Sequence, residues 1–135
     1  MPPGGRSGGL TVQLAEVHAW LRDALAELRA DLRPGRDLRA HCLTFCTALE
    51  RHHTGEDAHL FGHLAQRYPE LRPALDALRS DHAVVSGILR EIEKLVDGER
   101  DPERLRRALD GLSALLESHF RYEERALAAA LEGAG

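Results

Sequence analysis

The chain has 135 residues, of which 43% are hydrophobic and 30% charged, and its formal net charge is −4. This length is enough for one globular domain with a substantial core. The negative net charge and the lack of a basic run give no reason to expect a nucleic-acid partner. Aromatic residues make up only 4%, whereas leucine, alanine and arginine are abundant, and this mixture favours helices.

Residues 1–9 are rich in proline and glycine, and we expect them to form a flexible N-terminal tail. This stretch lacks the apolar centre of a secretory signal. No apolar run in the sequence approaches the ~20 residues that a membrane-spanning helix needs. We therefore expect a cytoplasmic protein with no membrane contact.

Four segments after the tail carry apolar residues three and four positions apart, which is the spacing of an amphipathic helix with one buried stripe. Short connections join these segments. They predict an all-α fold, an antiparallel up-down-up-down four-helix bundle that occupies residues 10–131. The predicted helices span about residues 10–33, 37–68, 73–97 and 102–131.

Polar residues interrupt the apolar stripe of the second predicted helix. His52, His53 and Glu56 stand where the stripe should continue. Glu56 falls near its centre, and the two histidines flank it on opposite sides. Such groups are costly to bury unless they are bonded to something. Gly55 weakens a helix by ~1 kcal/mol relative to alanine, and we interpret it as a sign that a neighbouring helix or a ligand packs closely there.

The other three predicted helices carry similar interruptions. A histidine stands at a core position of the first helix, His18, and of the third, His82. The fourth helix carries His119 and Glu123, four residues apart. Residues at this spacing lie on one face of a helix, so they form a pair like the one in the second helix.

All of these residues are predicted to lie at about the same depth in the bundle, given a rise of ~1.5 Å per residue and alternating helix directions. Each alone could be a core histidine bonded to a backbone carbonyl, or an acid paired with an arginine. Together they would not be buried without a partner, so we interpret them as ligands of a metal site. The candidate ligands are His18, His52, His53, Glu56, His82, His119 and Glu123.

The donor set indicates which metals such a site would bind. Imidazole and carboxylate groups without thiolate favour iron, manganese or zinc. Seven ligands exceed one tetrahedral zinc site. They suit two octahedral ions bridged by Glu56 and Glu123, with one position left for dioxygen, peroxide or nitric oxide. A structural bundle with buried histidines and no metal is the alternative.

Several further residues have two interpretations each. Asp57 and Glu124 either face solvent or orient a ligand, and Tyr122 either acts near the site or is a core aromatic residue. Cys42 and Cys46 are interpreted as small core residues, with redox sensing as the alternative. Three more histidines, at the edge of the stripe, are expected on the surface or behind the ligands: His41, His59 and His63.

The candidate ligands follow the pattern of a known family. The chain resembles the hemerythrin-like domain, also called the HHE cation-binding domain, from residue 10 to residue 131. That domain has a histidine on its first and third helices and a His-x-x-x-Glu pair on its second and fourth. The resemblance implies a non-haem, oxo- or hydroxo-bridged pair of iron ions in a four-helix bundle. The matching residues are His18, His52 with Glu56, His82, and His119 with Glu123.

Two differences separate the chain from oxygen-carrying members of that family. Those members have a His-x-x-x-His pair on the third helix, where this chain has Ser86 four residues after His82, and His53 is the candidate for the missing imidazole. Their last carboxylate follows its histidine by five residues rather than four. The resemblance therefore implies a protein that binds or reacts with dioxygen or peroxide, with a peroxidase- or catalase-like enzyme as one form. A sensor of oxygen, nitric oxide or iron is the alternative.

Overall fold

The computed structural model describes residues 10–30, 32, 36–97 and 101–133. The expected tail, residues 1–9, lies outside this part. The all-α prediction is confirmed, because the described residues form helices and no strand. None of the described helices is both long and apolar enough to cross a membrane. In chain order, the elements are α1 (Leu10–Ala30), α2 (Arg36–Gly55), the π-helix η1 (Glu56–Leu60), α3 (Phe61–Arg67), the 3-10 helix η2 (Pro69–Leu71), α4 (Arg72–Asp97) and α5 (Pro102–Gly133).

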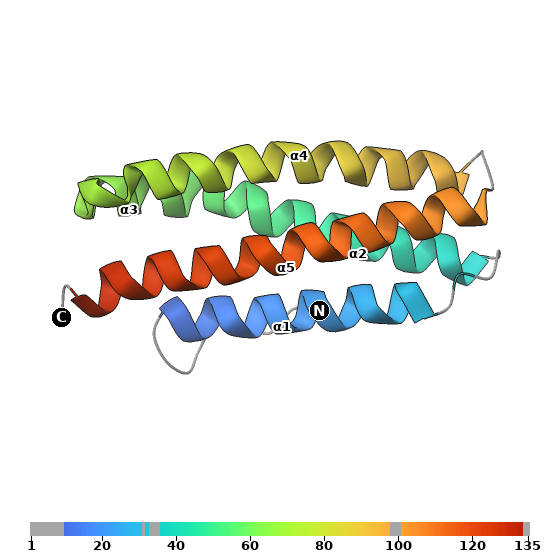
Figure 1. The fold of residues 1–135 in the computed structure, drawn as a ribbon, viewed down its shortest axis with the longest axis horizontal. Coiled ribbons are helices and arrows are strands. Elements are labelled where there is room, and N and C mark those ends of the chain that lie inside the picture. The colour runs from blue at the N-terminus through green and yellow to red at the C-terminus, as the bar shows by residue number, and fades with distance from the viewer. Residues whose placement is uncertain (1–9, 31, 33–35, 98–100, 134–135) are drawn as a thin grey trace.

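The long helices lie side by side as a bundle (Figure 1). Helices α1 and α4 run in one direction along it, and α2 and α5 run in the other. Helix α1 packs against α2 and α5, and α4 packs against the same two helices. Each long helix therefore contributes one face to a shared interior, where residues from distant parts of the chain meet.

The second predicted helix is not a uniform α-helix. It consists of α2, the π-helix η1 and α3. Gly55, the last residue of α2, has ordinary helical angles of φ −62° and ψ −41°. The expectation that a neighbouring helix packs closely at Gly55 is wrong, because a Cβ built there would meet no atom of another helix within 4 Å. π-helical turns are rare in proteins, and those that occur are frequently found at functional sites. The π-helix of this chain begins at Glu56.

Two apolar clusters fill the interior, with the polar residues between them. Along α1, His18 stands between Leu14 of the smaller cluster and Leu21 of the larger one. The same order holds along α4 around His82. Burial of these clusters contributes about 25 cal/mol for each Å² of apolar surface removed from water. It also fixes the depth of the polar layer between them.

Both cysteines lie in the larger apolar cluster. Cys42 and Cys46 are free thiols with 1% and 2% of their surface exposed. Burial raises the pKa of Cys42 to about 11 and that of Cys46 to about 12. The interpretation of this pair as small core residues is therefore confirmed, and neither thiol carries the low pKa of a reactive cysteine.

Candidate metal centre

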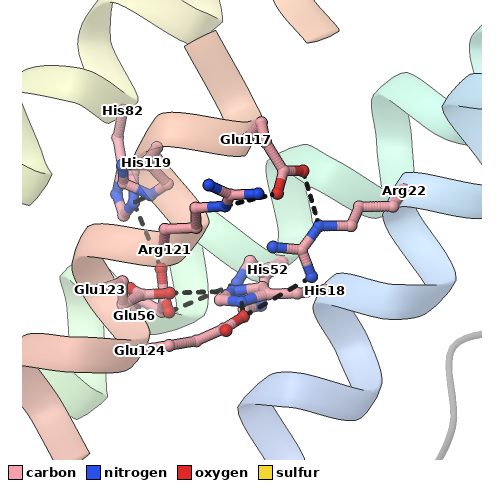
Figure 2. A network of polar contacts seen from close by, with 10 residues as sticks. All are labelled: His18, Arg22, His52, Glu56, His82, Glu117, His119, Arg121, Glu123 and Glu124. Atoms are coloured by element: carbon pink, nitrogen blue, oxygen red, sulfur yellow. Dashed lines mark hydrogen bonds and ion pairs between the residues drawn. The ribbon is translucent and has the colours of Figure 1, made fainter. Parts of the chain in front are cut away.

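The seven candidate ligands converge in the layer between the two apolar clusters, and Figure 2 shows six of them. Helices α1, α2, α4 and α5 each supply at least one ligand, and Glu56 is the first residue of η1. Six of the seven are buried, and the side chain of His52 is 12% exposed. The prediction that these residues meet at one depth is confirmed.

The seven residues form two groups, each with donor atoms close enough together to hold one metal ion. Within each group, one donor atom of every residue lies within 4.8 Å of the others. Glu56 belongs to both groups, whereas Glu123, the other carboxylate expected to lie between two ions, belongs to one. The first ligand group is His18, His52, Glu56 and Glu123, and the second ligand group is His53, Glu56, His82 and His119.

Short contacts in the first ligand group join atoms that do not hydrogen-bond to each other. His18 Nε2 lies 2.9 Å from Glu123 Oε1, and His52 Nε2 lies 3.3 Å from an oxygen of Glu56. Despite these distances, none of these atoms has a hydrogen-bond partner. Buried polar atoms almost always have a partner, so cations at the two centres would account for this pattern. Among the described residues, the buried side-chain atoms without a partner are Nε2 of His18, His52 and His53 and both carboxylate oxygens of Glu56 and Glu123.

Carboxylates hold three of the imidazoles from behind. A carboxylate that accepts a hydrogen bond from Nδ1–H leaves the Nε2 lone pair free to bind a metal. The three pairs, with their Nδ1-to-oxygen distances, are His18 and Glu124 (2.6 Å), His82 and Asp57 (2.8 Å), and His119 and Asp81 (3.0 Å).

The atoms at the centre of the second ligand group repel one another unless a cation lies among them. His82 Nε2 lies 3.2 Å from His119 Nε2 and 3.2 Å from Glu56 Oε1. With both Nδ1 atoms donating to carboxylates, the two Nε2 atoms direct lone pairs at each other. His53 stacks on His82, with 3.8 Å between ring centroids. A cation bound among these atoms would turn the repulsion into ligation.

Two of the three orienting carboxylates were among the sequence candidates. Asp57 and Glu124 each bind a histidine, which resolves their two interpretations in favour of orientation. Asp81 was missed. The sequence gives one indication of its role, which is its position directly before His82. Its hydrogen-bond partner is His119 on the neighbouring helix α5, so the pairing follows from helix packing.

A stack of side chains leads from the first ligand group to the surface. The rings of His18 and Phe120 are 4.0 Å apart and nearly parallel. The Arg22 guanidinium lies 5.4 Å from the centre of the Phe120 ring, within cation–π range. Arg22 also lies 3.8 Å from Glu124 and donates a 2.8 Å hydrogen bond to Glu117 (Figure 2). This hydrogen bond lowers the pKa of Glu117.

The second ligand group has a matching set of neighbours. Phe61 lies beside His82, with 5.7 Å between ring centroids. The Arg79 guanidinium is 5.8 Å from the centre of Phe61. Arg79 also donates a hydrogen bond to the backbone oxygen of Asp57, whose carboxylate binds His82. Both groups are therefore backed by the same order of arginine, phenylalanine, histidine and carboxylate.

Burial keeps several of the imidazoles neutral. It lowers the pKa of His52 to about 4 and that of His53 far below its ordinary value. Burial also lowers the pKa of His82, against the opposing effect of the Asp57 carboxylate. At pH 7 these rings therefore carry no charge, which is the form that ligates metals.

The two buried carboxylates differ in protonation. Burial, followed by contact with the Glu123 carboxylate, raises the pKa of Glu56. Burial also acts to raise the pKa of Glu123, but interactions with His18 and Glu56 outweigh it and lower that pKa. Two adjacent buried carboxylates cannot both be ionised without compensation. Bound cations would supply the positive charge that keeps both ionised.

Other residues considered as site candidates lie outside the two ligand groups. Tyr122 is 38% exposed, so the core aromatic interpretation is wrong. Ser86 donates a 3.0 Å hydrogen bond to Glu50. Three further histidines are exposed: His41, His59 and His63.

The fold and the site together define a class of protein, a helix bundle whose interior presents histidine and carboxylate groups suited to metal ions. The model of the hemerythrin HHE cation binding domain family matches residues 10–131, and the chain belongs to this family. Comparison with curated proteins and with solved structures gave no significant match.

Proposed function

We propose that this chain is a non-haem di-iron protein that binds or reacts with dioxygen or peroxide at a carboxylate-bridged iron pair. The observation that carries this proposal is the position of Glu56. Its Oε2 lies 3.3 Å from His52 Nε2 in the first ligand group, and its Oε1 lies 3.2 Å from His82 Nε2 in the second. Both oxygens are buried and lack hydrogen-bond partners. A carboxylate in this position is suited to bridge two ions.

Iron is favoured by the donor set and by the number of donors. Imidazole and carboxylate ligands suit iron, manganese and zinc, but two groups that share a carboxylate exceed a tetrahedral zinc site. Iron, when bound, would supply the redox chemistry that dioxygen and peroxide require. The chain's own residues would hold neutral imidazoles in place, neutralise the ions with carboxylates and exclude bulk water.

The two ligand groups offer different surroundings for a small molecule. The first has two imidazoles and the second has three. Each group supplies four residues, but the side chain of His52 in the first group is 12% exposed, whereas the histidines of the second group are all buried. A small molecule from solvent would therefore reach an ion in the first group more readily. We propose that dioxygen or peroxide reacts at the first ligand group, beside His18 and His52.

An alternative function is a sensor or binding module for oxygen, nitric oxide or iron that works without turnover. The observation that favours it is the path from His18 to the surface. Glu124 binds His18, Arg22 lies near Glu124, and Glu117 accepts hydrogen bonds from Arg22 and Arg121 (Figure 2). A change at His18 would alter the charges of this exposed network, and a partner protein bound there could respond to that change.

Peroxide consumption by iron-loaded protein separates the two functions. If the protein is an enzyme, we expect it to consume many peroxide molecules per iron. If it is a binding module, we expect a spectral change without continued consumption. Glu56→Gln should abolish both responses, and His63→Ala, at an exposed histidine, is the matched control. Failure of the wild-type protein to take up iron, with the bundle folded, would refute both functions.

A further inference from the structure

A groove of about 620 Å³ runs between α1 and α2 and reaches His52. This volume lies within the ~300–1,000 Å³ typical of small-molecule sites. Its walls are mainly apolar, with Val17 and Trp20 on α1 and Leu43 on α2. Threonine hydroxyls and one arginine, Arg51, supply its other polar groups apart from His52, and its lining residues include no carboxylate.

Arg51 gives the groove a cationic end. It is exposed, and within the described part of the chain no ion pair joins it to a carboxylate, whereas Arg22 and Arg29 are both paired. A neighbouring hollow that Arg51 also borders contains Glu50 and Glu93, but neither carboxylate forms an ion pair with it. The guanidinium is therefore available to an anion lying in the groove.

The surroundings of the two ligand groups, which are otherwise similar, differ at the groove. The residue before His82 is Asp81, whose carboxylate binds His119 of the second ligand group. The residue before His18 is Val17, which lines the groove. At the position where Asp81 gives the second group an additional carboxylate, the first group is therefore bordered by an apolar surface that leads outward.

We propose that this groove binds an amphipathic organic anion, with its carboxylate on Arg51 and its apolar body along Val17, Trp20 and Leu43. From Leu43 to Arg51 the groove follows eight residue steps along α2, a length of ~12 Å. An aliphatic acid of medium chain length fits this distance. Binding does not require iron, so it is independent of the proposed function, although an occupant would lie against the ring of His52.

Trp20 reports on binding directly, because it is the single tryptophan of the chain and lines the groove. We would follow its fluorescence in the full-length protein, with and without iron, during titration with hexanoate, octanoate, decanoate and dodecanoate below their micelle concentrations. Affinity should rise about fourfold for each added methylene until the groove is filled. Decanoate should bind more tightly than decanol, and decanol more tightly than decylammonium.

Two variants test the role of charge. Arg51→Gln should weaken decanoate binding about fivefold and leave decanol binding unchanged. Leu43→Glu, checked for folding by circular dichroism, should weaken decanoate binding further because it adds a negative charge to the groove. Arg107→Gln is the matched control, at an exposed arginine of α5 that does not line the groove.

Three results would overturn the proposal. The first is no saturable change in Trp20 fluorescence with any of the acids. The second is equal affinity for decanoate and decylammonium, or an unchanged decanoate affinity in Arg51→Gln, which would show that charge plays no part. The third is a concentration-dependent dimer that protects Trp20 and blocks decanoate, which would assign the groove to a second copy of the chain.

Discussion

His52 and His53 are adjacent in the chain, yet their imidazoles belong to two different ligand groups. Their ring centroids are 5.5 Å apart, and the rings are tilted by 45°. One step along a helix turns the side chain by about 100°, so adjacent residues reach opposite sides of the polar layer. Glu56, about one turn later, belongs to both groups. One short segment therefore supplies three of the seven candidate ligands.

This division predicts separate effects on the two ions. His53→Ala removes an imidazole from the second ligand group alone, and we expect it to lose one of the two iron ions. Glu56→Ala and His119→Ala should lower both the iron content and the melting temperature of the iron-loaded protein, with the larger loss for Glu56→Ala because it belongs to both groups. Metal analysis and thermal unfolding would measure these changes.

The exposed residue His63 provides the control for these substitutions. His63→Ala should keep both ions and the melting temperature of the wild-type protein. Full iron content in both Glu56→Ala and His119→Ala would show that the ligand assignment is wrong.

The carboxylates behind the histidines should control metal affinity without contacting the metal. Asp81→Asn removes the negative charge that polarises His119, so we expect iron affinity to fall ~10–100-fold. Glu124→Gln should act similarly through His18. Competition with a chromophoric chelator would measure the affinities. Asp23→Asn, at an exposed position of α1, should change nothing, and an equal loss in that variant would point to general electrostatics.

The sequence predicts the helices and the candidate ligands well because both follow from periodicity. Leu14 and Leu21 define the buried stripe of α1, and His18 lies on the same stripe. The spacing of the leucines alone therefore predicts that a polar residue in such a series faces the interior. Alternating helix directions then place residues such as His18 and His82 at one depth.

The π-helix and the partner of His119 could not be predicted in this way. A π-helical turn is set by hydrogen bonding over a few residues. The apolar stripe resumes at Leu60 and Phe61, where the π-helix ends, so the apolar pattern gives no sign of it. The pairing of Asp81 with His119 depends on how α4 and α5 pack. The groove at His52 likewise depends on the spacing between two helices rather than on either sequence segment.

Gly55 offers a test of the local energetics. The residue has helical angles, and a Cβ there would meet no atom within 4 Å. Gly55→Ala should therefore stabilise the protein by ~0.5–1 kcal/mol, because alanine loses less backbone entropy on folding. Urea unfolding of the metal-free protein would measure this change. A loss of stability would instead indicate that the start of the π-helix requires glycine.

The buried cysteines should be inert at neutral pH. Burial raises the pKa of Cys42 to about 11 and that of Cys46 to about 12, so alkylation by iodoacetamide at pH 8 should be slow in the folded protein and fast in urea. The neutral thiols favour the folded state. Their contribution to stability is therefore complete below pH 9 and is lost as the pH rises through about 11 to 12.

Substitution of both thiols tests whether they take part in function. Cys42→Ser with Cys46→Ser should leave the iron content unchanged, because neither residue belongs to a ligand group. Loss of a redox response in this double variant alone, with iron retained, would support the cysteine-sensor interpretation.

Anaerobic titration of the metal-free protein with ferrous iron tests the central claim most directly. Bound iron would be counted by metal analysis, and air or peroxide would then be admitted while the visible spectrum is recorded. We expect two iron ions per chain, followed by charge-transfer absorption on oxidation. A folded bundle that binds one ion or none would contradict the assignment of a shared site to the two ligand groups.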